Sequence, residues 1–294
     1  MERKNIYIVG SINTDLVISA PYMPENGETL TGGGFFTARG GKGANQAVAA
    51  ARLGGSVRMC GCVGDDSFGR EAVASLAADG VDVSHIRVVE NTPTGTAVIV
   101  VVDGNNRIIL DKGANAALRP EDIDRFLADA REGDIYLTQL ENPIDVIGYG
   151  LKKAQEKKLY VILNPAPACK EIEPYLQYCD LVTPNESETE LLGGIGQLLT
   201  KAKKLLITLG GDGFKIVDTA GETRFPCIAV QTVDTTAAGD TLCGGLCAGL
   251  VAGKSLAEAA QFGSKAASIA CTRKGAQPSI PTREEVECYG SAAN

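Results

Sequence analysis

The chain has 294 residues, of which 28 are lysine or arginine and 36 are aspartate or glutamate, so its net charge at pH 7 is −8. This length suffices for one large α/β domain or two modest ones, each with a substantial core. The acidic balance argues against broad binding to nucleic acid or to a membrane surface, and because no apolar run near the amino terminus is long enough for a signal peptide, we expect a cytosolic protein.

Short apolar runs alternate with alanine-rich helical patterns along most of the chain. This alternation is typical of βαβ units and predicts a mainly parallel sheet. The expected core strands are Ile6–Val9, Val57–Val63, Ile135–Leu140, Leu159–Leu163, Leu181–Thr183 and Leu205–Leu209. The expected helices are Ala44–Leu53, Arg70–Asp79, Pro120–Ala130, Ile144–Lys157, Ser187–Leu192, Thr241–Ala252 and Leu256–Thr272.

Two segments interrupt the alternation, at about residues 15–39 and 94–112. Both are typical of antiparallel strands, and the second has a hairpin turn between Val102 and Arg107. We expect them to form a small sheet apart from the main one. Since each follows the end of a core strand, we hypothesise that they form a lid that excludes water from a binding site.

Polar and glycine-rich residues follow most of the expected strands. In open α/β sheets, ligands bind beyond the carboxyl ends of the strands. The sequence therefore predicts one site that is spread over several loops. The segments concerned are Gly10–Asp15, Gly64–Asp66, Gln139–Glu141, Asn164–Pro167, Thr183–Glu186 and Thr208–Gly213.

The run Asp234–Asp240 immediately precedes a stretch of small and apolar residues that predicts a helix. Free backbone N–H groups at a helix start attract an anion, and Asp240 in the same place is able to take a proton from an alcohol. Phosphorylation of a hydroxyl group needs both features. The alternative is that Asp240 only caps the helix.

Gly40–Asn45 is a second glycine-rich run before a helix, and it differs from a P-loop. Lys42 and Asn45 offer donors to a polyhydroxy ligand, and Asn13, Asp15 and Glu141 offer acceptors. The alternatives are a plain helix start for the run and a surface role for each polar side chain.

Three further segments suit a nucleotide and cations. The Thr208–Gly213 loop is flexible enough to fold over ribose or phosphates. Asn185 and Glu188 suit a hydrated Mg²⁺, although they suit capping of the following helix equally well. The loop Thr272–Ser279 is rich in carbonyls of the kind that hold a monovalent cation, but the residue pattern alone does not predict one.

Taken together and in this order, the motifs resemble those of the PfkB-type carbohydrate kinases, and within that family those of members that phosphorylate ribose. The resemblance extends from about Ile6 to Pro281. It implies one kinase domain over residues 1–294, with a Rossmann-like, mainly parallel sheet flanked by helices and a small antiparallel β lid. It further implies a homodimer paired through the lid, and ATP-dependent phosphorylation of ribose at its primary 5-hydroxyl.

The resemblance also implies roles for individual residues. Asp240 would be the general base, and the backbone amides of Ala237, Ala238 and Gly239 would bind the anion, together with Mg²⁺ near Asn185 and Glu188. The sugar would contact Asn13, Asp15, Gly41, Lys42, Gly43, Ala44, Asn45, Glu141 and Asp240. ATP would contact Asn185, Thr208, Leu209, Gly210, Gly211, Asp212, Gly213, Gly239 and Ser264. Potassium would be held by Asp234, Thr236, Ala270, Arg273, Gly275 and Ser279.

Three segments depart from the family pattern. Leu242–Gly244 replaces the usual residues after Thr241, residues 193–204 are short for a full crossover helix, and Ser264 is small for a neighbour of adenine. Related acceptors therefore stay open, namely 2-deoxyribose, fructose and a nucleoside such as adenosine. A sugar sensor without catalysis is a further alternative, although sugar binding alone requires neither Asp240 nor the glycine-rich nucleotide loop.

Overall fold

A nine-stranded, mainly parallel sheet forms the body of the protein in the computed structural model, which describes residues 4–290. Its strands lie in the order β13-β12-β11-β10-β9-β8-β1-β4-β5. All pairings from β11 to β5 are parallel, and β12 and β13 add an antiparallel hairpin at one edge. The strands are β1 Ile6–Val9, β4 Val57–Gly64, β5 Asp82–Val89, β8 Ile135–Thr138, β9 Tyr160–Leu163, β10 Leu181–Val182, β11 Leu205–Thr208, β12 Phe214–Asp218 and β13 Gly221–Phe225.

Helices cover both faces of this sheet. In β1, Ile6 and Ile8 belong to the core formed with α1, α2, α7 and α8, whereas Tyr7 and Val9 belong to the core formed with α3 and α4. Because both faces of the central strands are buried, strands such as β1 and β9 are continuously apolar. The helices are α1 Lys42–Arg52, α2 Ser67–Ala78, α3 Pro120–Phe126, α4 Ile144–Glu156, α5 Glu186–Leu191, α6 Gly194–Leu199, α7 Ala238–Val251, α8 Leu256–Ala270 and α9 Arg283–Cys288. Among residues 4–290, none of these helices has the length and apolar character needed to cross a membrane.

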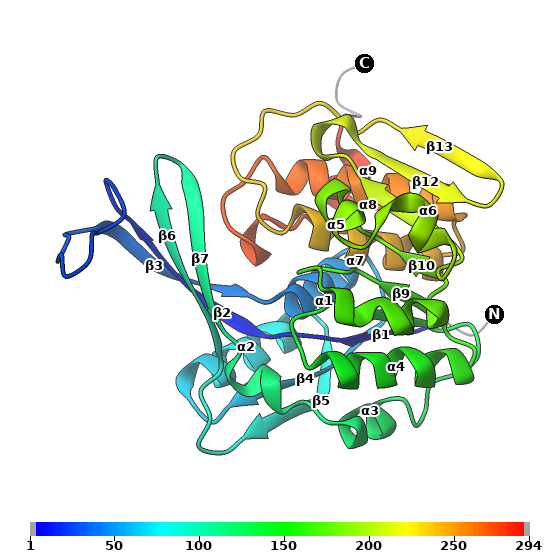
Figure 1. Ribbon diagram of the computed structural model, residues 1–294, viewed down its shortest axis with the longest axis horizontal. Helices are drawn as coiled ribbons and strands as arrows, with labels where there is room; N and C mark the ends of the chain where they lie inside the picture. Colours follow the sequence, from blue (N-terminus) through cyan, green and yellow to red (C-terminus); the bar gives the residue numbers. More distant parts are fainter. Residues whose placement is uncertain (1–3, 291–294) are drawn as a thin grey trace.

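A separate four-stranded sheet projects from the main body (Figure 1). Its strands, in the order β3-β2-β6-β7, are β3 Gly33–Gly40, β2 Asn13–Ser19, β6 Gly95–Val102 and β7 Asn105–Asp111. The two outer pairings are antiparallel, as expected, but β2 and β6 in the centre are parallel. The reason is that β2 follows β1 and β6 follows β5, and these parallel strands of the main sheet point toward the same edge.

The expected core strands are all present, and each end lies within two residues of its expected position. The hairpin turn is also confirmed, since Val102 pairs with Asn105 and both Asp103 and Gly104 have positive φ. The sequence interpretation missed β5, the β12–β13 hairpin and α9. The short segment 193–204 contains α6, so two short helices, α5 and α6, connect β10 to β11.

Candidate active site

The polar strand ends meet at the carboxyl edge of the main sheet, where α1 and α7 also begin. Asn45 on α1 donates its side-chain amide to Oδ2 of Asp240 on α7 at 3.0 Å, although 195 positions separate the two residues. Gln46 donates to Oδ1 of the same carboxylate at 2.9 Å. Two glycine-containing motifs that lie far apart in the sequence thus meet at Asp240.

The backbone before Asp240 has an unusual conformation. Ala237, the residue that precedes α7, has φ 59° and ψ 13°, in the left-handed region that an alanine occupies at a cost of about 1–2 kcal/mol. The N–H of Ala238 donates to the carbonyl of Thr235 at 3.2 Å, whereas those of Gly239 and Asp240, in the first turn of α7, have no partner within the helix and are available to an anion. A strained residue at this place is typical of a functional site.

The charge of Asp240 depends on opposing influences. The side chain is 6% exposed, and burial raises its pKa. Lys42 and the amides of Asn45 and Gln46 act in the opposite direction, whereas Glu141 adds to the rise. Burial alone would lower the pKa of Lys42, but nearby carboxylates, Asp240 first among them, raise it above its usual value. A charged lysine therefore lies beside the carboxylate.

A second cluster of polar groups surrounds Glu141. Its Oε2 accepts a hydrogen bond from the backbone N–H of Lys42 at 3.1 Å and another from the hydroxyl of Ser11. Burial, with a contribution from Glu141, raises the pKa of Asp15 from 3.8 to about 6. Gly41 has φ +89°, and a Cβ there would lie 2.7 Å from the backbone nitrogen of Asn13. The glycine lets the loop before α1 pass directly against residues 11–13, where β1 leads into β2.

Asn115 belongs to this cluster and was missed in the sequence. Its side chain accepts from the backbone N–H of Ile12 at 2.9 Å, and it donates to Oδ1 of Asn13 at 2.7 Å. It thereby orients Asn13, which is itself buried. No local motif marks an asparagine as a partner for a residue about 100 positions away. Ser11, Gln46, Gln139 and Asn164, which lie in or beside the recognised motifs, were also not assigned roles.

Two adjoining cavities meet at the start of α7. The smaller, of about 220 Å³, is lined by Lys42, Glu188, Gly239 and Asp240, among others. The larger, of about 460 Å³, is lined by most of the residues expected for the nucleotide, including Gly210, Gly211, Gly213 and Ser264. Both cavities share Thr208, Thr235, Ala238 and Gly239. Leu209 and Asp212, although expected at the nucleotide, are not among the lining residues.

Asn185 and Glu188 form a reciprocal capping box at the start of α5. The backbone N–H of Glu188 donates to Oδ1 of Asn185, and that of Asn185 donates to Oε2 of Glu188, each at 2.8 Å. The capping alternative is therefore confirmed. Both residues also line the smaller cavity, where burial raises the pKa of Glu188. A carboxylate at this place fits a hydrated Mg²⁺.

The residues expected at potassium come from two loops that lie together. Oδ1 of Asp234 accepts from the backbone N–H of Thr236 at 2.9 Å, and Oδ2 accepts from the N–H of Gly275 at 2.9 Å. The guanidinium of Arg273 pairs with Glu285, and its backbone N–H donates to the carbonyl of Ala270 at 3.0 Å. Among residues 4–290, no group of three or more His, Cys, Asp or Glu side chains is placed to hold a metal ion.

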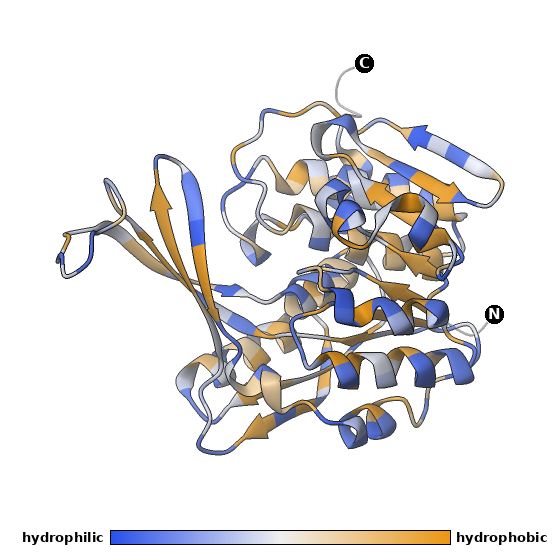
Figure 2. Cartoon of the chain, viewed as in Figure 1, coloured by the Kyte–Doolittle hydropathy of each residue, from blue (hydrophilic) through white to orange (hydrophobic). Residues whose placement is uncertain are grey.

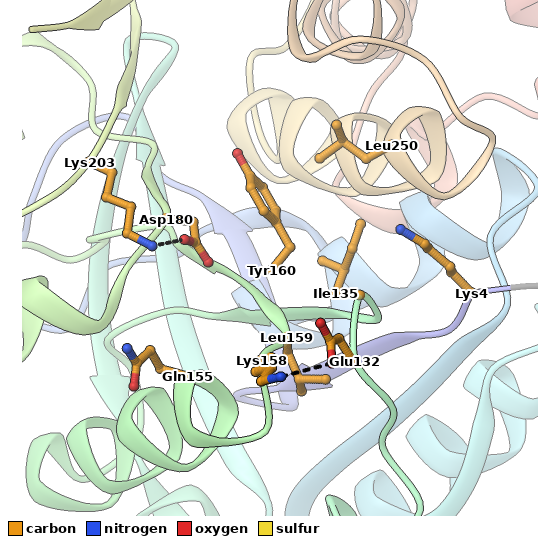
Figure 3. A pocket seen from close by; sticks show the side chains of 11 residues that line it. Lys4, Glu132, Ile135, Gln155, Lys158, Leu159, Tyr160, Asp180, Lys203 and Leu250 are labelled. Carbon is orange, nitrogen blue, oxygen red and sulfur yellow. Dashed lines mark hydrogen bonds and ion pairs between the residues drawn. The ribbon is translucent and has the colours of Figure 1, made fainter.

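A further cavity, of about 530 Å³, lies at the opposite edge of the main sheet (Figure 3). Most of its lining residues stand at or before the beginnings of the strands, as Ile135, Tyr160 and Asp180 do. Lys158 pairs there with Glu132, and Lys203 pairs with Asp180. None of the expected site residues lies in this cavity.

Comparisons with known proteins agree with this geometry. The model of the pfkB family carbohydrate kinases matches residues 3–283. A ribokinase of Haemophilus influenzae is 43% identical and covers 96% of this chain and 97% of that protein, and a deoxyribokinase of Salmonella typhi is 34% identical and covers 97% and 98%. The solved structure of Arabidopsis thaliana ribokinase complexed with ribose and ATP is 31% identical, with a TM-score of 0.87 and coverage of 97% of this chain and 98% of that one. The chain belongs to the pfkB family of carbohydrate kinases.

Proposed function

We propose that this protein is an ATP-dependent ribokinase, which transfers the γ-phosphoryl group of ATP to the 5-hydroxyl of D-ribose. One observation carries the proposal: a buried carboxylate, Asp240, lies beside a helix start where a nucleotide-sized cavity adjoins a polar cluster. The names of the relatives with 43% and 31% identity support ribose as the acceptor and ATP as the donor.

The polar cluster would bind the sugar. Asn13, Asp15 and Glu141 offer acceptors to its hydroxyl groups, and Lys42 and Asn45 offer donors. Gly41 and Gly43 bring the backbone of the run from Gly41 through Asn45 against the residues that follow β1. We propose that this run therefore forms one wall of the sugar site. The primary hydroxyl would then face Asp240.

Asp240 would act as the general base. It removes the proton from the hydroxyl oxygen, which then attacks the γ-phosphorus, a role that contributes typically about 10²–10⁴-fold to the rate. The backbone N–H groups of Gly239 and Asp240, which follow the left-handed Ala237, would face the charge that develops on the phosphoryl oxygens. Lys42 lines the smaller cavity, beside Asp240, and adds a positive charge there.

Two cations complete the proposal. Asn185 and Glu188 would hold a hydrated Mg²⁺, which would neutralise the charge of the phosphate oxygens. Potassium would fit between the 234–236 and 270–279 loops, through Asp234, Thr236 and the backbone of Ala270, Arg273, Gly275 and Ser279. The effect of potassium on turnover would be indirect, because Asp234 stands at the start of the loop that leads to Ala237.

We further propose that residues 1–294 form one kinase domain whose lid is the small sheet. Asp15 and Val17 lie on one face of β2, and the register places Ile99, Ile108 and Phe36 on that same face. Ile108 is 59% exposed and Phe36 51% exposed, and Figure 2 shows apolar residues along β6 and part of β7. Large exposed apolar side chains suit an interface, so we propose that a second copy of the chain packs its lid on this face.

The second candidate acceptor is 2-deoxyribose. The deoxyribokinase of Salmonella typhi is 34% identical across nearly the whole chain, and a single hydroxyl group separates the two sugars. A site that hydrogen-bonds the 2-hydroxyl would reject the sugar that lacks it, because the buried partners would stay unpaired.

An ADP-release assay with ribose, 2-deoxyribose, fructose and adenosine tests the proposal. We expect the highest kcat/KM with ribose and a requirement for Mg²⁺. A preference for 2-deoxyribose would establish the second candidate. Sugar binding without turnover on any acceptor would refute the kinase assignment and favour a sensor.

A further inference from the structure

The side chain of Gln46 lies between Asp240 and Asn164. Its amide nitrogen Nε2 donates to Oδ1 of Asp240 at 2.9 Å and to Oδ1 of Asn164 at 3.1 Å. Both N–H groups of the amide are therefore engaged. The side chain has no exposed surface, so water does not replace either contact.

The orientation of this amide is fixed from its other side. Oε1 of Gln46 accepts a hydrogen bond from Nε2 of Gln139 at 2.6 Å, and Nδ2 of Asn164 donates to the backbone carbonyl of Thr183 at 3.0 Å. If Gln46 turned over, its nitrogen would face the nitrogen of Gln139 and its oxygen would face the carboxylate of Asp240. Gln46 is consequently restricted to donating to Asp240.

Gln139 is held in turn by the end of β1. Its Oε1 is buried and has no hydrogen-bond partner in the part of the chain that the structure describes, and it lies against the backbone of Gly10, where any Cβ would overlap it. A buried acceptor without a partner costs about 1–3 kcal/mol. The same orientation of the Gln139 amide that leaves its oxygen without a partner lets its nitrogen donate to Gln46.

We propose that Gln46 and Gln139 are positioning residues for the proton transfer, which hold the carboxylate of Asp240 with Oδ1 on Gln46 and Oδ2 on Asn45. This inference rests on the proposed role of Asp240 as the base. It adds a relay of buried amides that runs from Gln139, after β8, through Gln46 to Asp240, with a branch through Asn164 to the end of β10.

The relay also favours the charged carboxylate over the acid. A proton on Oδ1 of Asp240 would bring an O–H group against the N–H of Gln46, whose orientation is fixed, whereas the carboxylate accepts from both Gln46 and Asn45. The titratable groups that face Asp240 from the neighbouring elements, and that stay in place in the variants below, are Lys42 on α1, Glu141 after β8, Glu188 on α5 and the thiol of Cys243 on α7.

The test is a titration of Asp240 itself, by carbon NMR of protein labelled at the aspartate carboxyl groups, with the signal assigned by its loss in Asp240→Asn. In Gln46→Met, which keeps the length of the side chain without its donors, we expect the pKa of Asp240 to rise by about one unit or more. Gln139→Met should shift it in the same direction by less, although Gln139 does not touch Asp240. Gln155→Met, on the exposed far edge of α4, should leave it unchanged.

Turnover provides the second readout. In Gln46→Met the acidic limb of the pH profile of kcat should move to higher pH with the NMR titration, while the KM for the sugar changes little. An unchanged titration of Asp240 in both Gln46→Met and Gln139→Met would overturn the inference, as would a loss of activity that is uniform across pH. If Asp240→Asn kept full turnover, the base assignment would fail, whereas the NMR titration would still decide whether the relay sets the charge of Asp240.

Discussion

The backbone N–H of Gly275 donates to Oδ2 of Asp234 at 2.9 Å, and this bond joins the loop before α7 to the loop after α8. The other oxygen of the carboxylate accepts from both the N–H and the hydroxyl of Thr236. These bonds hold the pKa of Asp234 below its usual value, although burial alone would raise it. One charged side chain thus fixes the backbone that leads to Ala237 and Asp240.

Replacing Asp234 should therefore uncouple turnover from potassium. In Asp234→Ala we expect a fall in kcat of roughly ten-fold or more, equivalent to about 1.4 kcal/mol, because the loop that carries the amides loses its fixed position. The wild type should be stimulated by potassium and the variant should not. Asp218→Ala is the matched control, since Asp218 accepts from the N–H of Ala220 at 2.9 Å in an edge hairpin away from the site. A wild type indifferent to potassium would remove the cation site.

Gly239 and Gly244 both lie on α7, but we expect Gly239 to affect catalysis and Gly244 to affect packing against α1. A Cβ on Gly239 meets nothing within 4 Å, and this glycine lines both cavities. A Cβ on Gly244 would lie 2.5 Å from that of Ala49 on α1. Gly239→Ala should leave the melting temperature nearly unchanged and lower kcat/KM for ATP, because the methyl group occupies space needed by the phosphates.

Gly244→Ala should instead lower the free energy of unfolding by about 1–3 kcal/mol, since α1 and α7 must move apart. Urea denaturation and the ADP-release assay, applied to both variants, distinguish the two effects. Equal losses of stability in the two variants would contradict the open space seen above Gly239.

Asp15 should make sugar affinity depend on pH. Its pKa is about 6, because of burial and then of Glu141, and only the ionised carboxylate has both oxygens free to accept from sugar hydroxyls. The KM for the sugar should therefore decrease as the pH rises through about 6. In Asp15→Asn the KM should be higher and nearly constant from pH 5 to 8. A wild-type KM that does not change across this interval would argue against Asp15 as a sugar ligand.

The same pKa has a consequence for stability. Since the pKa in the folded protein lies above the ordinary 3.8, the folded state binds the proton more tightly than the unfolded state. This contribution to stability is fully present below pH 4 and is lost as the pH rises through about 6. Asp15→Asn should consequently be more stable relative to wild type at pH 8 than at pH 5, as measured by urea denaturation at both values.

Ile108 and Ile109 are neighbours in β7 that point to opposite faces of the lid. They are 59% and 71% exposed. Because Ile108 shares the face of Asp15, Ile108→Lys should convert the proposed dimer to a monomer in sedimentation analysis, without a change in the fold seen by circular dichroism. Ile109→Lys should remain dimeric. A wild type that sediments as a monomer would refute the interface.

Much of this arrangement could be predicted from local patterns. The core strands were found because both of their faces are buried, and Asp240 was found because glycine, a carboxylate and an apolar helix follow one another in the chain. β5 was missed since its alternating polar residues, such as Ser84 and Arg87, give no continuous apolar run. The parallel pairing of β2 with β6 and the role of Asn115 depend on contacts between segments 80 or more positions apart, which no local pattern encodes.

The central claim is that Asp240 takes the proton from the acceptor hydroxyl. The direct measurement is kcat for ribose in Asp240→Asn, which is nearly the same size as the wild-type side chain, together with calorimetric binding of ribose and ATP. We predict a fall in kcat of about 10²–10⁴-fold with binding constants close to those of the wild type. A kcat near that of the wild type would contradict the account.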